Sequence, residues 1–219
     1  MTDAQSATLS ARLRAAGCVF AEEEAAVLFD AARDVEHLEE MAVRRCAGEP
    51  LEHVVGTVRF GSVDLHVGPG VFIPRQRSLL LARVAAEAIA SRHVEQPVVV
   101  EAYCGVAPIA VAVADGTVGA RIHAVDIDPT ALDYARRNLP IDAHAHLGDG
   151  LSTLPRQLRG AVDVIAAVPP YVPDGAVDLL PHETEHELRP RSSLVTKAST
   201  TFADSSPTPR SGSPTVARC

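Results

Sequence analysis

The stretch from Pro97 to Pro129 (PVVVEAYCGVAPIAVAVADGTVGARIHAVDIDP) constrains the fold of this chain more than any other. A short apolar run ends in Glu101, and a turn containing Gly105 follows. An alanine- and valine-rich segment of helical length comes next, and a second apolar run ends in Asp126. Continuous apolar runs are typical of parallel strands buried on both faces, which a crossover helix joins. The pattern predicts a strand–turn–helix–strand unit with a carboxylate at the end of each strand.

The segments that flank this unit extend it to a doubly wound α/β sheet. They are a helix over 79–90, a helix over 130–139, and strands over 143–147 and 162–168. Asp149 follows the third of the four strands. Ligands of such sheets bind at the carboxyl ends of the strands. We therefore expect Glu101, Asp126 and Asp149 to converge on one site.

Two smaller regions precede the sheet. The pattern of residues 1–50 predicts a helical cap with acidic outer faces, which either binds a substrate or only packs against the rest of the chain. Residues 51–78 predict a β-hairpin and linker, because apolar and polar residues partly alternate around a turn at 60–62. Arg75 and Arg77 end this linker. They either contact an acidic ligand or partner, or begin a solvated helix.

The character of the chain changes at about residue 189. Residues 189–219 are rich in Ser, Thr and Pro and show no periodicity of a strand or helix. This composition predicts a disordered tail. The α/β domain would then span 79–188, and its sheet would stop after four strands with an open edge.

Composition narrows the partners and the compartment. The formal net charge of −8 indicates no basic face for nucleic acid. The chain has no apolar run of about 18 residues and no basic-then-apolar start, so we expect no membrane association and a cytoplasmic location. The four cysteines form no CxxC pair and fit reduced thiols better than disulfides or a zinc site.

The turn after the first strand indicates the ligand class. Backbone N–H groups at a helix start must approach a ligand closely, which requires small residues. Gly105 meets this requirement, whereas Tyr103 and Ala107 stand where a dinucleotide or S-adenosylmethionine loop often has glycine, and they crowd the approach. Asp126 either accepts two ribose hydroxyls or is an ordinary strand-end or capping acid. Together with Asp149, these residues predict an adenosyl-ligand pocket.

The most specific motif is Val168-Pro169-Pro170-Tyr171, directly after the fourth strand. Two prolines hold an extended backbone with free carbonyl groups, beside which the tyrosine packs. Similar signatures are GEPLEHVVGTVRFGSVDLHVGPGVFIPR (48–75) and AVDIDPTALDYARRN (124–138). On these residues the chain resembles the HemK/PrmC-type protein-(glutamine-N5) methyltransferases, which modify peptide-chain release factors.

The resemblance implies a Rossmann-like class I methyltransferase fold, S-adenosyl-L-methionine as cofactor, a protein substrate such as a release factor, and no metal. In this family the Asn side chain of an Asn-Pro-Pro-Tyr motif and a proline carbonyl accept the hydrogens of the substrate amide. The nitrogen of that amide then attacks the sulfonium methyl group. The residues at the corresponding positions here are, for catalysis, Val168, Pro169, Pro170 and Tyr171; for the cofactor, Glu101, Tyr103, Gly105, Asp126, Ile127 and Asp149; and for the substrate, Phe72, Pro74 and Arg75.

The chain departs from the family pattern at several points. Val168 replaces the Asn and removes the side-chain acceptor. Ser78-Leu79 stands where the family usually has Thr-Glu. Beyond Arg189 the Ser/Thr/Pro-rich tail replaces the expected loop, helix and strands, and we hypothesise a reading-frame shift, which translation of the adjacent frame would test. The alternatives are a pseudoenzyme that binds a ligand or partner without turnover, and a methyltransferase for another acceptor.

A competing motif is His182-Glu183-Thr184-Glu185-His186, which matches the HExxH pattern of zinc proteases. That site needs a longer helix and a third ligand, but Pro190 follows closely and no histidine comes after His186. We therefore favour the methyltransferase interpretation. The other histidines look scattered and are interpreted as surface or core residues: His53, His66, His123, His144 and His146.

Overall fold

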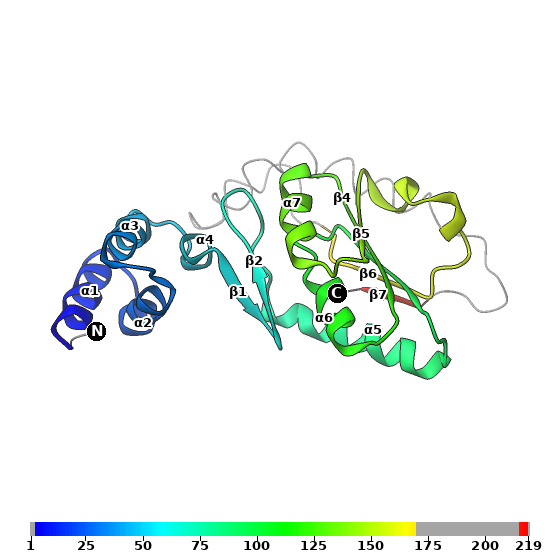
Figure 1. Ribbon diagram of the computed structural model, residues 1–219, viewed down its shortest axis with the longest axis horizontal. Coiled ribbons are helices and arrows are strands. Elements are labelled where there is room, and N and C mark those ends of the chain that lie inside the picture. The colour runs from blue at the N-terminus through cyan, green and yellow to red at the C-terminus, as the bar shows by residue number, and fades with distance from the viewer. Residues whose placement is uncertain (1–2, 170–214, 219) are drawn as a thin grey trace.

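The computed structural model describes residues 3–169 and 215–218 of the chain. A helical domain, a β-hairpin and an α/β domain follow one another along the long axis of the molecule (Figure 1). Within these described ranges, no helix is long and apolar enough to cross a membrane.

The N-terminal domain consists of helices with a core of their own. They are α1 (Asp3–Ala15), α2 (Ala21–Ala31), α3 (Val35–Cys46) and the short α4 (Leu51–Val55). Leu13, Leu28 and Met41, from the first three helices, are almost fully buried in a common cluster. Asp34 caps α3 by accepting a hydrogen bond from the backbone N–H of His37 at 2.8 Å. Apolar residues at helical spacing therefore build a small helical domain.

The hairpin connects this domain to the sheet. Its antiparallel strands are β1 (Thr57–Phe60) and β2 (Val63–His66), followed by a short 3₁₀ turn, η1 (Gln76–Ser78). Gly61 makes the hairpin turn with a φ of +62°, which glycine adopts without strain. Phe60 and Leu65 are fully buried and pack against Val111 of the α/β domain. The hairpin is thereby fastened to the domain that follows it.

A five-stranded parallel sheet forms the centre of the α/β domain. In spatial order its strands are β5 (His144–Leu147), β4 (Arg121–Asp126), β3 (Val98–Ala102), β6 (Val164–Ala167) and β7 (Thr215–Arg218). Every residue of β3 and β6 is buried, as expected for the central strands of a parallel sheet. The sheet confirms the predicted Rossmann-like α/β class.

The two faces of the sheet are covered unequally. The main core contains residues of three helices, which are α5 (Leu79–Arg92), α6 (Pro108–Gly116) and α7 (Pro129–Asn138). On the other face, Val100, Val125 and Ile165 form a smaller cluster with residues of the segment that holds two 3₁₀ turns, η2 (Gly150–Thr153) and η3 (Arg156–Leu158). The described helices thus protect one face much better than the other.

Strand β7 differs from the expectation for the tail. The sequence predicts no regular structure beyond residue 189, but Thr215–Arg218 pairs with β6 in parallel register, with Val216 opposite Ile165. An open edge of β6 would leave backbone N–H and C=O groups unpaired, and the distant segment supplies partners for them. The prediction of disorder is wrong for these four residues, because composition does not report a pairing with a distant strand. Positions 189–214 lie outside the described residues.

The ion pair between Glu24 of α2 and Arg45 of α3 predicts a stability effect. Both side chains are only 13% exposed, and Nε of Arg45 lies 2.6 Å from a carboxylate oxygen of Glu24. Glu24→Ala would leave a mostly buried guanidinium without this partner, so we expect a loss of about 2 kcal/mol in the free energy of unfolding. Chemical denaturation measures this value.

Glu22→Ala is the matched control. Glu22 lies in the same first helical turn, but its pair with Arg14 is 60% and 59% exposed, respectively. We expect this control to lose clearly less stability than Glu24→Ala, because solvent screens an exposed ion pair. Equal losses in the two variants would contradict the role given to burial of the Glu24–Arg45 pair.

Candidate functional site

The candidate site lies at the carboxyl edge of strands β3, β4 and β5. Because these strands are parallel neighbours, their ends bring Glu101, Asp126 and Asp149 to the same side of the sheet. Glu101 and Asp126 are buried, at 2% and 6% exposure, and Asp149 is half-buried. Asp126 is the last residue of β4, whereas Glu101 lies inside β3, one residue before its end.

A tight turn joins β3 to helix α6. Within it, the backbone N–H of Gly105 donates to Oδ2 of Asp126 at 2.7 Å, and the backbone N–H of Cys104 donates to the carbonyl of Val125 at 3.0 Å. Tyr103, Gly105 and Ala107 have positive φ values of 56°, 55° and 63°. This conformation costs a non-glycine residue about 1–2 kcal/mol. The turn therefore has the backbone conformation of a glycine-rich loop, although only one of its three positive-φ positions is a glycine.

Asp126 ties this turn to the neighbouring strand. Besides Gly105, it accepts a hydrogen bond from the backbone N–H of Asp128 at 3.0 Å. Helix α7 is capped by Asp128, which accepts from the backbone N–H of Thr130 at 2.8 Å, so Asp126 is not the capping acid. A carboxylate oxygen can accept more than one hydrogen bond, so both oxygens of Asp126 keep capacity for a ligand. The second oxygen of Asp128 is buried and has no partner among the described residues.

The side chain of Glu101 forms hydrogen bonds with the start of helix α6. Its carboxyl oxygens accept hydrogen bonds from the backbone N–H groups of Ile109, at 3.3 Å, and Ala110, at 2.7 Å. Burial raises the pKa of Glu101 to about 8, and the two backbone hydrogen bonds only partly oppose this effect. The carboxyl group thus holds α6 against β3.

Tyr103 reaches from the end of β3 to the turn after β5. Its hydroxyl oxygen lies 3.7 Å from the position that a Cβ atom would occupy at Gly150. Burial raises the pKa of Tyr103, and the negative charge of Asp149 adds to this effect. By contrast, the methyl group of Ala107 is fully buried in the main core under the helices. The two non-glycine residues of the turn therefore face different surroundings.

The residues predicted for catalysis and substrate binding flank this edge. Val168 and Pro169 follow β6, and the pairing of Ala102 with Ala167 makes Tyr103 and Val168 leave the sheet side by side. Val168 is half-buried and packs against the main core. Pro170 and Tyr171 lie outside the described residues.

The linker after the hairpin holds the remaining predicted residues. Pro74 is buried, Phe72 is half-buried, and Arg75 is exposed with its guanidinium carbon 5.1 Å from the centre of the Phe72 ring. The neighbouring Val71 packs with Val106 of the β3–α6 turn, so this linker lies against the turn. Ile127 follows Asp126 and is half-buried.

Sequence reasoning missed Asn138, the last residue of α7. Its side chain accepts a hydrogen bond from the backbone N–H of His66 at 2.7 Å and donates to the carbonyls of His66 and Val106, each at 3.0 Å. One amide group thereby joins the hairpin, the β3–α6 turn and α7. A lone Asn at a helix end carries no local signal for such contacts, because its partners are distant in the chain.

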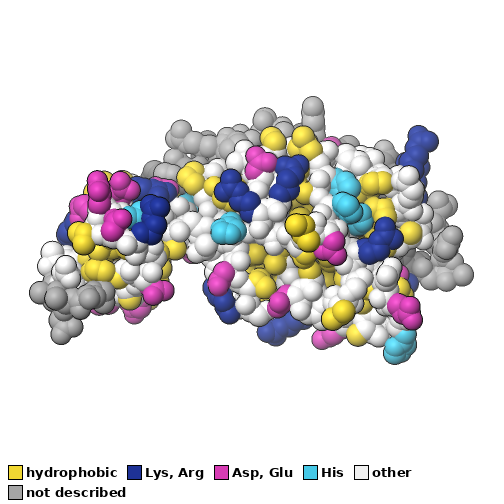
Figure 2. Space-filling view, in the orientation of Figure 1, with side chains coloured by type: hydrophobic (Ala, Val, Ile, Leu, Met, Phe, Trp, Pro, Cys, Tyr) yellow, Lys and Arg dark blue, Asp and Glu magenta, His cyan; other side chains and the backbone are white. Residues whose placement is uncertain are grey.

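Three histidines that look scattered in the sequence lie together on the less protected face of the sheet. His123 is opposite His144 in the register, and Nδ1 of His123 lies 3.0 Å from Nε2 of His146. Burial, together with the charges of His146 and His144, lowers the pKa of His123 to about 4. Figure 2 shows histidine side chains gathered on the surface of this domain. Within the described ranges, no group of three or more His, Cys, Asp and Glu residues is placed to hold a metal ion, and the His182–His186 motif lies outside them.

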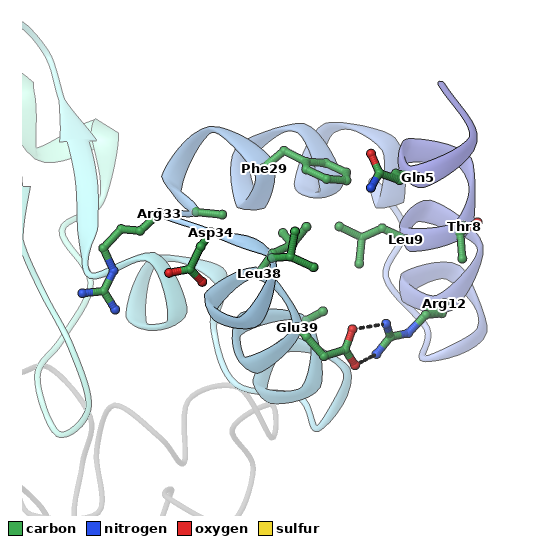
Figure 3. A pocket seen from close by; sticks show the side chains of 12 residues that line it. Gln5, Thr8, Leu9, Arg12, Phe29, Arg33, Asp34, Leu38 and Glu39 are labelled. Atoms are coloured by element: carbon green, nitrogen blue, oxygen red, sulfur yellow. Dashed lines mark hydrogen bonds and ion pairs between the residues drawn. The ribbon is translucent and has the colours of Figure 1, made fainter. Parts of the chain in front are cut away.

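A hollow of about 550 Å³ lies between α1, α2 and α3 in the helical domain (Figure 3). Apolar side chains of Leu9, Phe29 and Leu38 line it, and Arg12 forms two hydrogen bonds with Glu39 at its rim, of 2.6 and 2.7 Å. The hollow is separate from the strand edge. Both roles predicted for this domain, substrate binding and packing alone, stay predictions.

The parallel sheet, the tight turn before α6 and the acids at adjacent strand ends define a Rossmann-like α/β protein, and the acids lie at the edge where ligands of such sheets bind. The chain is similar to the release factor glutamine methyltransferases of Mycobacterium leprae, with 43% identity over 145 residues, and Mycobacterium tuberculosis H37Rv, with 39% identity over 160 residues. These matches cover 64% and 68% of this chain and 49% and 51% of the relatives. The similarity confirms the family resemblance predicted from the motifs, and the chain spans about half the length of the curated relatives it matches.

Family models and solved structures were also compared with the chain. The chain matches no family model. A tRNA (uracil-54, C5)-methyltransferase of Pyrococcus abyssi, solved with S-adenosyl-L-homocysteine, matches with a TM-score of 0.41 and 22% identity, over 63% of this chain and 32% of that one.

The raised pKa of Glu101 predicts a pH dependence of stability. Between its usual value near 4.5 and about 8, the folded chain holds a proton on Glu101 that the unfolded chain releases. Stability therefore falls as pH rises through this window, by at most about 1.4 kcal/mol per pH unit. His123 acts in the opposite direction, but only below its usual value of 6.5. We expect the free energy of unfolding to fall from about pH 6.5 to 8.

Glu101→Gln should flatten this slope, because the variant cannot ionise at that position. Denaturation curves of both proteins across the window measure the slopes, and any constant loss of stability in the variant does not affect the comparison. An unchanged slope in Glu101→Gln would assign the pH dependence to another group.

Proposed function

We propose that the chain binds S-adenosyl-L-methionine at the β3–β4–β5 edge and methylates the side-chain amide of a glutamine in a protein, namely a peptide-chain release factor. The observation that carries this proposal is the bond between Gly105 and Asp126, which sets the turn at the helix start against an acid at the next strand end. Identity of 37–43% to release factor glutamine methyltransferases supports it.

The chemical types of the residues at this edge suit an adenosyl group. Asp126 offers carboxylate oxygens for two ribose hydroxyls, and the unsatisfied oxygen of Asp128 is a further acceptor two residues away. Gly105 keeps the turn free of a side chain at its centre. Glu101 supports the cofactor indirectly, because its carboxyl group fixes the start of α6. When bound, the cofactor would supply an activated methyl group.

The acceptor side of the site is less complete. The resemblance assigns the substrate amide to the position of Val168 and to the carbonyls of the prolines that follow. Val168 is aliphatic and packs on the main core, so its side chain accepts no hydrogen bond from an amide. In this chain the backbone carbonyls would have to orient the glutamine nitrogen.

Val168 also favours a second candidate function, in which the chain binds the cofactor or a protein partner without turnover. An oriented hydrogen-bond partner contributes about 10²–10³ in rate to a reaction of this kind, and the side chain at 168 does not supply it. Ligand binding at the strand edge does not need that acceptor. Binding and methyl transfer therefore have to be measured separately.

We infer a cytoplasmic protein that acts on another protein. A release factor works on the ribosome in that compartment, and the net charge of −8 does not favour direct contact with nucleic acid. Phe72, Pro74 and Arg75 are proposed to contact the substrate, since their linker lies against the β3–α6 turn.

Replacement of Asp126 tests the cofactor site. Asp126→Asn keeps the size of the side chain but replaces one acceptor oxygen with an NH2 group, which opposes a backbone N–H of the turn and removes an acceptor for ribose hydroxyls. We therefore expect S-adenosylhomocysteine to bind about tenfold more weakly or worse. Asp133→Asn is the control, because Asp133 is an exposed acid of α7 that pairs with Arg136, and we expect this variant to bind as the unaltered chain does. Isothermal titration calorimetry measures both affinities. Equal affinity of Asp126→Asn and the unaltered chain would contradict the assignment of Asp126.

Val168→Asn tests the acceptor. Restoring an amide acceptor beside the prolines should raise the rate of methyl transfer to a release factor by about 10²-fold, while the affinity for S-adenosylhomocysteine stays the same. Transfer of a radiolabelled methyl group measures the rate, and Val168→Ala controls for loss of the valine packing. If Val168→Asn is no faster than Val168→Ala, the assigned role of position 168 is wrong.

A further inference from the structure

The side chain of Tyr103 lies across the edge where the proposed ligand binds. It starts directly after β3, and its hydroxyl approaches Gly150, which follows β5. Strand β4 lies between these two strands, and neighbouring strands are separated by about 4.8 Å. The tyrosine therefore spans the end of β4, where Asp126 is located.

The surroundings of Tyr103 agree with this position. The side chain is half-buried, and burial together with the charge of Asp149 raises the pKa of its hydroxyl. Asp126 itself is only 6% exposed, which leaves little of its carboxylate open to a ribose. A pocket ready for an adenosyl group would expose this carboxylate.

The backbone of the turn does not require a tyrosine. Residue 103 has a φ of 56°, a conformation that glycine adopts freely and that other residues adopt at a cost. Gly105 provides the bond to Asp126 without help from the side chain at 103. The path of the turn is therefore set by other residues and does not need the Tyr103 ring.

We propose that the Tyr103 side chain closes the adenosyl site of the ligand-free chain and has to rotate away from Gly150 before S-adenosylmethionine binds. This inference rests on the proposed function of the strand edge. A ligand that binds only the open state shows a dissociation constant raised by the reciprocal of the open fraction. Tyr103 thereby sets the affinity of the site.

Calorimetric titration of the full chain with S-adenosylhomocysteine tests the closure. Tyr103→Gly removes the ring and keeps the turn conformation, so we expect about tenfold tighter binding, as for a site that is open one-tenth of the time. Ala107→Gly is the matched control. It relieves the same backbone conformation, but its methyl group lies in the core away from the edge, and we expect a change of less than about twofold.

The outcomes separate the two proposals. If Tyr103→Gly binds no more tightly than the unaltered chain, the closure is wrong and the proposed cofactor site stands. If Ala107→Gly gains as much as Tyr103→Gly, the backbone and not the ring limits binding, and the closure is again wrong. If neither the unaltered chain nor Tyr103→Gly binds at millimolar ligand, the proposed function fails, and the closure fails with it.

Movement of the ring has a spectroscopic readout that does not depend on activity. The chain has three tyrosines and no tryptophan, so its near-ultraviolet absorbance reports mainly on tyrosine. Ligand should produce a tyrosine difference spectrum as the ring moves from the half-buried position into water. Tyr103→Phe should lose most of that spectrum. The same spectrum in Tyr103→Phe and the unaltered chain would show that the ring at 103 does not move, and would overturn the closure.

Discussion

The hydrogen bond from the backbone N–H of Gly105 to Asp126, at 2.7 Å, joins the parts of the molecule on which the candidate site depends. It links the turn after β3 to the end of β4, and Asp126 also accepts the N–H of Asp128 at the start of α7. The carboxyl group of Glu101 fixes the start of α6 in the same way. Two buried acids thus set the position of two helices relative to the central strands. At this edge the acids accept hydrogen bonds from backbone donors that would otherwise be unpaired.

The same edge contains a conflict between local preference and tertiary structure. Tyr103 and Ala107 hold positive φ values that their residue types disfavour. The fold imposes these values because β3 has to turn into α6 within a few residues, while both elements are fixed by burial. For Ala107 the core accommodates the methyl group. For Tyr103 the ring occupies the strand edge itself. The neighbouring Val168 likewise places an apolar side chain where the resemblance implies a polar one.

Tertiary packing also assembles the surroundings of the site. Asn138 binds the hairpin and the β3–α6 turn at once, and Val71 packs on Val106, so the linker that carries Phe72 and Arg75 is held beside the strand edge. The less protected face of the sheet carries the three clustered histidines, whose positive charges would repel one another in acid. The methyltransferase resemblance covers the edge and the linker, and it does not account for this cluster.

The sequence by itself determined the sheet class and the positions of its central strands along the chain. Fully buried parallel strands leave continuous apolar runs, such as Val98–Val100 of β3, which Glu101 follows directly. Only the tertiary structure decided what each side chain does. The carboxyl group of Glu101 accepts hydrogen bonds from the start of α6, Tyr103 extends across the edge to Gly150, and Thr215–Arg218 pairs with β6 from a segment with no strand pattern. The reason is physical: periodicity records burial along one element, whereas hydrogen bonds and contacts between distant elements leave no local pattern.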